Sequence, residues 1–177
     1  MKQDNQFQFY KSQHLDQVTV LQAEMNDFSY GKHAHDEYSF GVTLAGRQDF
    51  FASREFHRSH PGNIIIFNPG EVHDGRSGVD DKLQYRMLYV HPNQLEPMLH
   101  SAGIAQSRDF QITDTTLDDP LLRQHILNIT WLIESQNDNK LHQECELYQI
   151  ALRISQRYGE CSTSNKGRKT DPLLLQA

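Results

Sequence analysis

The sequence has few cysteines and no excess of positive charge. Its two cysteines, Cys145 and Cys161, form no metal-binding spacing with each other or with nearby histidines. This favours reduced thiols in a cytoplasmic protein over a disulfide framework. The 17 basic and 23 acidic residues give a formal charge of −6. A chain of this charge does not bind nucleic acid through net positive charge, so any contact with DNA must come from a local patch or from outside this chain.

Long apolar runs are also missing. No segment approaches the roughly 20 apolar residues that a membrane-spanning helix needs. The polar N-terminus lacks the apolar core of a signal peptide. We therefore expect a soluble, cytoplasmic protein that does not enter a membrane. The 177 residues suffice for one domain, or for one domain with an appended helical part.

From Val18 to Val90 the chain alternates short strand-like segments with turn residues. Gly46 and the turn sequences HPG, NPG and RSGVDD supply the breaks. Short strands at this spacing predict an antiparallel sandwich or barrel rather than alternating strand–helix units. The expected strands are residues 18–25, 39–46, 48–53, 63–70 and 83–90.

After Pro92 the spacing of the apolar residues becomes helical. A short helix is expected over 92–103, and the next begins with Asp119 as its cap and Pro120 at the first helical position. Its apolar stripe and that of residues 140–158 predict two helices that pack on the core. The second stripe is wide enough to contact a partner subunit as well. Its members are Leu141, Cys145, Tyr148 and Leu152, widened by Leu147, Ala151, Ile154 and Tyr158.

These patterns divide the chain into four parts. Residues 1–14 are polar apart from three aromatic side chains, and they form either an arm that closes over a pocket or a disordered tail. Residues 15–92 form the strand-rich part and residues 93–158 the helical part. Residues 159–177 are polar and without period until the last few, which predicts a linker.

Alternate positions of one segment carry two histidines and a glutamate. In HAHDEYSFG, the side chains of His33, His35 and Glu37 would point to one side of an extended chain. Imidazole and carboxylate groups suit a metal such as zinc, iron or nickel. They suit equally well a small molecule whose orientation they would fix by hydrogen bonds. A polar sheet edge without any ligand is the third interpretation.

Two more polar features lie further along the chain. In GNIIIFNPGEVHDG, Glu71 and His73 follow an Asn-Pro-Gly turn and would share a face if the chain is extended there. Arg86 lies among large apolar residues in LQYRMLYV, so it needs a carboxylate or a ligand if it is buried, and neither if it lies at an edge in solvent. An inward Arg86 would favour an anionic or zwitterionic ligand.

Together, these segments resemble a known family. HAHDEYSFGVTLAGRQDF, PGNIIIFNPGEVHDG and YRMLYV, followed by two helices, are similar to the N-terminal sensor domain of AraC-type transcription regulators in order and separation. The resemblance covers about residues 15–158. It implies a mainly β fold, with a cupin-like double-stranded β-barrel (a jelly roll) over residues 15–92 and a C-terminal pair of α-helices.

The resemblance also implies a function, that of an effector-sensing domain and not an enzyme. Its effector would be an amino acid, an organic acid or a sugar. Two subunits would form a homodimer through the C-terminal helices, chiefly residues 140–158. DNA would be bound only by a helix-turn-helix domain beyond the linker and outside this chain. The residues expected to bind the effector are His33, His35, Glu37, Glu71, His73 and Arg86.

Cupins use two histidines and a glutamate of a first motif, with a histidine of a second, to surround a metal or a ligand. The corresponding set here is His33, His35, Glu37 and His73, which would hold a divalent transition metal such as Zn, Ni or Fe. The family's glutamate follows the second histidine by four or five residues, where this chain has Ser39 or Phe40. Glu37 lies on the same face but nearer. This departure favours a sensor over the alternative, a stand-alone cupin metalloenzyme such as an oxygenase or isomerase.

Overall fold

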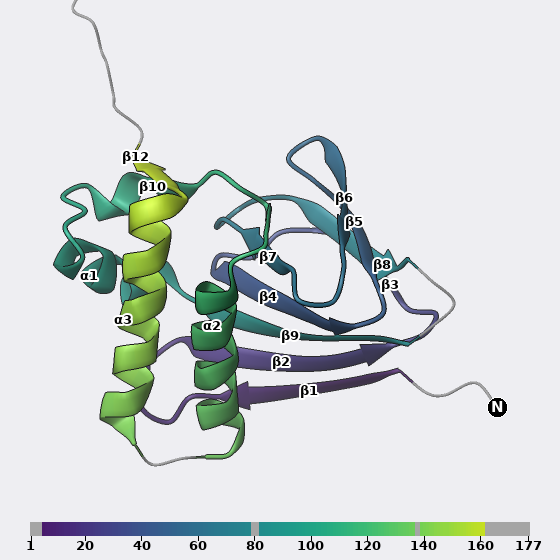
Figure 1. Cartoon of the computed structure of the whole chain (residues 1–177), viewed down its shortest axis with the longest axis horizontal. Helices are drawn as coiled ribbons and strands as arrows, with labels where there is room; N and C mark the ends of the chain where they lie inside the picture. Colours follow the sequence, from purple (N-terminus) through teal and green to yellow (C-terminus); the bar gives the residue numbers. More distant parts are fainter. Residues whose placement is uncertain (1–4, 79–81, 137–138, 162–177) are drawn as a thin grey trace, which may run out of the picture.

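The computed structural model describes residues 5–78, 82–136 and 139–161, and most of its strands form two antiparallel sheets that face each other (Figure 1). The larger sheet contains, in spatial order, β1 (Gln6–Lys11), β2 (Val18–Met25), β9 (Leu83–Val90), β4 (Tyr38–Ala45), β7 (Ile64–Phe67) and β11 (Thr116–Leu117). The smaller sheet contains β3 (Ser29–His33), β8 (His73–Ser77), β5 (Gln48–Ala52) and β6 (Glu55–Ser59).

Helices follow the strands in the chain and gather at the side of the molecule opposite the smaller sheet (Figure 1). They are α1 (Pro92–Ser101), α2 (Pro120–Glu134) and α3 (Lys140–Arg157). A 3-10 turn, η1 (Ser107–Asp109), and a short strand pair, β10 (Phe110–Ile112) and β12 (Gly159–Cys161), complete the helical part.

Two apolar layers hold these elements together. Between the sheets, Met87 of the larger sheet packs in one cluster with Phe50 of the smaller. On the other face of the larger sheet, Phe40 and Leu88 pack with Ile126 of α2. Neighbouring residues of one strand thus serve opposite layers, as the two-residue period of a strand requires. The predicted double-sheet jelly roll with C-terminal helices is confirmed.

The bounds of the apolar strands agree with the sequence pattern, whereas several polar strands were missed. β2 and β9 match the expected residues 18–25 and 83–90. β3, β6 and β8 were not predicted because they are short and carry many polar residues, with one face open to solvent. Of the two alternatives for residues 1–14, a disordered tail is wrong for residues 6–11, because β1 pairs with β2 along its whole length.

Helix α3 divides its apolar residues between two faces. Leu147, Ala151 and Ile154 are buried in the core with Ile150, as their spacing predicted. The other expected stripe is not core: Leu141 is 69% exposed and Cys145 is also exposed. The helix therefore presents an apolar face outward, away from α2 and the sheet.

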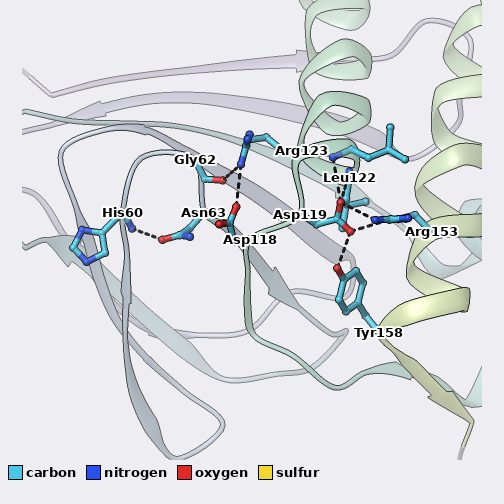
Figure 2. Close-up of polar contacts among 10 residues, drawn as sticks. His60, Gly62, Asn63, Asp118, Asp119, Leu122, Arg123, Arg153 and Tyr158 are labelled. Atoms are coloured by element: carbon cyan, nitrogen blue, oxygen red, sulfur yellow. Dashed lines mark hydrogen bonds and ion pairs between the residues drawn. The ribbon is translucent and has the colours of Figure 1, made fainter.

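The buried carboxylate of Asp119 joins the start of α2 to the end of α3 (Figure 2). It accepts the backbone N–H groups of Leu121 and Leu122, which confirms its predicted role as the N-cap before Pro120. It also accepts from the Arg153 guanidinium at 2.8 Å and from the Tyr158 hydroxyl at 2.7 Å. Burial alone would raise the pKa of Asp119, but these donors hold it well below its usual range.

The first residues of the predicted linker belong to a strand. Residues 159–161, the first part of the predicted linker, form β12 and pair with β10. Its remaining residues, 162–177, lie outside the described residues.

Candidate functional site

A cavity of about 660 Å³ lies between the two sheets, large enough for a small-molecule ligand. Its wall includes His33, His35, Glu37 and His73, four of the six residues expected to bind a ligand. The N-terminal part also reaches it, because Phe9 and Lys11 of β1 line the cavity. The polar motif identified in the sequence is therefore part of a cavity wall, although β3, which His33 ends, is an edge strand of the smaller sheet.

Three histidines converge in this wall. Two belong to the strands β3 and β8, and the third lies in the segment that connects β3 to β4. His33 ends β3 and His73 begins β8, and the two are opposite each other in the strand pair. His35 follows in the segment between β3 and β4. One nitrogen of each ring can be chosen so that all three lie within 4.8 Å of one another.

The sequence pattern suggested that the alternating motif forms one extended strand, but the structure divides it between two strands. β3 belongs to the smaller sheet and β4 to the larger, so the chain crosses between sheets within residues 34–37. His33, His35 and Glu37 nevertheless all line the cavity. The predicted shared face is retained in this sense, because the cavity lies between the two sheets that the segment connects.

The imidazole of His73 is neutral and fixed in orientation. Its Nδ1 lies 2.9 Å from the carbonyl oxygen of Glu71, which can only accept, so Nδ1 carries the proton and donates. Nε2 is therefore left as an acceptor or metal ligand. Burial lowers the pKa of His73 to about 4, and positive charge on His33 or His35 opposes protonation further. Its ring stacks on Phe67 with a centroid separation of 3.7 Å.

The other two histidines have similar but weaker constraints. His33 places Nδ1 2.6 Å from the carbonyl oxygen of Gly31, which assigns the proton to that nitrogen. Burial, followed by the nearby His33, lowers the pKa of His35, while Glu37 opposes that shift. Three converging imidazoles, two of which direct Nδ1 to a backbone carbonyl, are a donor set that fits a divalent transition metal.

Glu37 and Ser39 lie on the cavity wall beside the histidines. Glu37 is outside the group of three histidines whose nitrogens approach one another. Ser39 is fully buried, and its Oγ has no hydrogen-bond partner among the described residues. The structure thus brings together three members of the predicted metal set and leaves the fourth, Glu37, at a greater distance.

Two predicted ligand-binding residues lie elsewhere. Arg86 points to the opposite face of β9, where it forms an ion pair with Glu134 of α2 at 2.6 Å. Arg86 is therefore paired with a carboxylate, as expected for a partly buried arginine, but that carboxylate belongs to α2 and not to a ligand. Glu71 is in the turn before β8 and not in an extended strand; its carboxylate accepts the Asn68 backbone N–H and the Ser53 hydroxyl proton. Neither side chain lines the cavity.

Several cavity residues had not been recognised from the sequence. Tyr85, Met87 and Tyr89 alternate with Arg86 in β9, so the period of two could have identified them once the direction of the strand was known. Tyr30 and Gln48 come from strands of the smaller sheet. No local signal distinguishes them from other polar strand residues.

The described part of the chain contains no helix with both the length and the apolar character needed to cross a membrane.

Comparisons with known proteins place the chain in a family. A family model described as the AraC-like ligand binding domain matches residues 17–151. Among curated proteins, none matches the chain. Solved structures that resemble it include a conserved protein of unknown function from Streptococcus pyogenes, 14% identical, with a TM-score of 0.46 over 52% of this chain and 78% of that one.

Two further similar structures are described as cupins. A cupin 2 conserved barrel domain protein from Salinispora arenicola is 17% identical, with a TM-score of 0.44 over 52% of this chain and 79% of that one. The Cnp3 cupin domain of Schizosaccharomyces pombe is 11% identical, with a TM-score of 0.45 over 51% of this chain and 66% of that one.

Proposed function

Because the chain belongs to the AraC-like ligand-binding domain family, we propose that it is the effector-sensing and dimerisation part of a transcription regulator and not an enzyme. The observation that carries this proposal is the cavity between the sheets, with its three converging histidines. An amino acid, an organic acid or a sugar is of a size that such a cavity accepts. The regulator would act in the cytoplasm, where its DNA lies.

The effector would be oriented by groups of defined hydrogen-bonding character. Nε2 of His73 is an acceptor, because Nδ1 donates to a backbone carbonyl. Glu37 adds a carboxylate at the same end of the cavity, and Lys11 adds a cation from β1. If a divalent metal is bound, His33, His35 and His73 would hold it, and it would supply a positive charge that binds an oxygen of the effector.

The outward face of α3 supports a homodimer. Leu141, Cys145, Tyr148 and Leu152 recur at helical spacing, and Leu141 is 69% exposed. Apolar side chains that follow one stripe of a helix favour packing against another helix. In the proposed dimer, this stripe packs against its copy in a second subunit.

A contact between the cavity wall and α3 supports coupling of effector binding to the helices. Ser12 lines the cavity, and its hydroxyl donates to Oε1 of Gln143 in α3 at 2.8 Å. The Ser12 hydroxyl oxygen in turn accepts the backbone N–H of Leu15, which also lines the cavity. An effector that favours one arrangement of this segment would shift the population of α3 arrangements, and through them a DNA-binding domain outside this chain.

The alternative, a cupin metalloenzyme such as an oxygenase or isomerase, draws support from the three-histidine group. The position of Glu37 argues against it. This carboxylate lies outside the group, whereas the family's metal set includes its glutamate. A pocket whose carboxylate stands apart from the histidines is better suited to orienting a ligand.

A thermal-shift screen tests the effector site. The wild-type protein, Glu37→Gln, His73→Ala and the control His60→Ala are heated with single amino acids, organic acids and sugars. His60 is a suitable control because its side chain is exposed and lies outside the cavity wall. We expect one compound class to raise the unfolding temperature of the wild type and of His60→Ala, and to have a smaller effect on the other two. An equal response of all four proteins would contradict the proposal.

A further inference from the structure

The cavity has polar groups at its two ends and an apolar middle. Strand β9 lines it with Tyr89, Met87 and Tyr85 in succession. Tyr89 marks the histidine end, since its ring centroid lies 5.1 Å from that of His35. Tyr85 is four residues away, a separation of roughly 13 Å along a strand. We call this second end, formed by Tyr85, Gln48 and the hydroxyl of Tyr30, the tyrosine end. The Tyr30 ring extends from it toward His33, whose ring centroid is 5.8 Å away.

The middle of the cavity contains no polar side chain from the larger sheet. Leu21 of β2 is opposite Met87 in the strand pair, and both line the cavity. Phe67 of β7 lines the cavity at the histidine end, because it is opposite Ser39 in the strand pair and its ring stacks on that of His73. A ligand that passes from one end to the other therefore lies against aliphatic, thioether and aromatic groups.

The tyrosine end offers both a donor and an acceptor. The Tyr85 hydroxyl donates to the Tyr30 oxygen at 2.9 Å. This bond uses one of the two phenolic protons and leaves the proton of Tyr30 for another acceptor. Oε1 of Gln48 is buried and has no hydrogen-bond partner among the described residues. One free proton and one free acceptor oxygen match a group that both donates and accepts.

The tyrosine end is also uncharged. Burial raises the pKa of both Tyr30 and Tyr85, so both phenols keep their protons at neutral pH. Lys11 lies at the opposite end, because it pairs with Thr19 and Thr19 pairs with Tyr89. Asp74, which also lines the cavity, directs Oδ1 to the backbone N–H of Phe51 at 2.7 Å. Among the described lining residues, none at the tyrosine end offers a positive charge to an anionic group.

Unpartnered buried oxygens occur at both ends of the same cavity. Ser39 Oγ lies at the histidine end, because Ser39 is opposite Tyr89 in the strand pair. Gln48 Oε1 lies at the tyrosine end. Buried polar atoms without partners destabilise a protein, so a partner for each of these oxygens would offset this cost. A ligand that reaches both would supply the missing partners.

We propose that the effector is an elongated molecule with two polar ends and an apolar segment between them, an inference that rests on the proposed function. Its head binds among the histidines and Ser39. Its tail is an uncharged hydroxyl or carboxamide that donates to Gln48 Oε1 and accepts from Tyr30. The apolar segment lies on Met87 and Leu21, between the two ends.

Pairs of probes that differ by one hydroxyl test this proposal. They are 3-(4-hydroxyphenyl)propanoate with 3-phenylpropanoate, 8-hydroxyoctanoate with octanoate, and tyramine with 2-phenylethylamine, so that both charges of head are sampled. Binding is measured by calorimetry for the wild type and for Gln48→Met. We expect the hydroxylated member of at least one pair to bind wild type about tenfold more tightly or better. Gln48→Met should remove this advantage and leave the affinity for the unsubstituted member unchanged.

The unfolding temperature of Gln48→Met shows whether a loss of binding results from misfolding. Methionine has a similar length and no acceptor that needs a partner, so the unfolding temperature of the ligand-free variant should not fall below that of the wild type. The proposal is overturned if both members of every pair bind equally, if the advantage persists in Gln48→Met, or if no probe binds. A compact sugar that binds the wild type but not His73→Ala would overturn it too, while leaving the effector site itself in place.

Discussion

His33 and His73 are directly opposite each other in the antiparallel pair of β3 and β8, and their ring centroids are 4.4 Å apart. Each ring directs Nδ1 to a backbone carbonyl, of Gly31 and of Glu71 respectively. The strand pairing sets the distance between the rings, and the carbonyls set their tautomers. A pair of imidazoles held in this way is prepared for a ligand or metal before either arrives.

Metal binding is the first consequence to test. We expect the wild type, prepared without an affinity tag, to bind one equivalent of Zn²⁺ or Ni²⁺. A free metal concentration of 100 times the dissociation constant should raise its free energy of unfolding by about 2.7 kcal/mol. His73→Ala should lose both effects, because two imidazoles remain. His57→Ala is the control, since its ring stacks on Phe50 outside the group. Absence of stoichiometric metal by elemental analysis, with no thermal effect of added ions or chelator, would contradict this prediction.

The stability of the metal-free protein should depend on the protonation of His73. Its pKa is about 4 in the folded protein and lies near 6.5 in an unfolded chain. Between these values the unfolded state binds more protons, so the free energy of unfolding falls as pH decreases from about 6.5 to about 4, by up to about 3 kcal/mol. Denaturant titrations in chelator at several pH values measure this slope. His73→Gln should flatten it, and an equal slope in both proteins would disprove the assignment.

The position of the histidines was predictable from the sequence, but their use of two sheets was not. Alternate spacing placed His33, His35 and Glu37 on one face, and all three line the cavity. The spacing does not reveal that the chain crosses between sheets after His33. It also cannot give the distance between side chains, which is why Glu37 was grouped with the histidines although it lies apart from them.

Arg86 shows a second limit of sequence patterns. The alternation in β9 correctly separates Tyr85, Met87 and Tyr89 from Arg86, but it does not say which set faces the cavity. The face that β9 turns toward the cavity depends on α2, because Glu134 of α2 forms an ion pair with Arg86 on the other face of the sheet. A contact between residues 48 positions apart is a tertiary event, and no local pattern contains it.

The Asp119 carboxylate should contribute strongly to stability. It is 2% exposed, caps α2 and binds both Arg153 and Tyr158 (Figure 2). Asp119→Ala leaves the guanidinium without its partner and the helix without its cap, so we expect a loss of about 3–5 kcal/mol in the free energy of unfolding. The exposed neighbour Asp118 is the control, and Asp118→Ala should cost less than about 1 kcal/mol. Equal losses in urea titrations would refute this assignment.

The proposed dimer predicts a specific effect of charge on the outer face of α3. Sedimentation at low micromolar concentration should show two subunits for the wild type and one for the double variant L141E/Y148E. Two carboxylates on this stripe would be buried in the interface without partners. Glu55→Lys, on the exposed strand β6 of the opposite sheet, should remain a dimer. A monomeric wild type, or a double variant that still dimerises, would remove α3 as the interface.

The hydrogen bond from Ser12 to Gln143 links the cavity wall directly to α3, and it predicts how that helix responds to the N-terminal segment. Ser12→Ala removes the donor to Gln143 and the acceptor for the Leu15 N–H, which should destabilise the protein by about 1–2 kcal/mol. Hydrogen exchange of the amides around Gln143 should accelerate more than that of α1. Ser101→Ala, which removes a hydroxyl bound to the Pro97 carbonyl within α1, should leave α3 unchanged. If exchange in α3 is the same for both variants, the segment around Ser12 does not control the helix, and the effector must reach the dimer interface through the sheet instead.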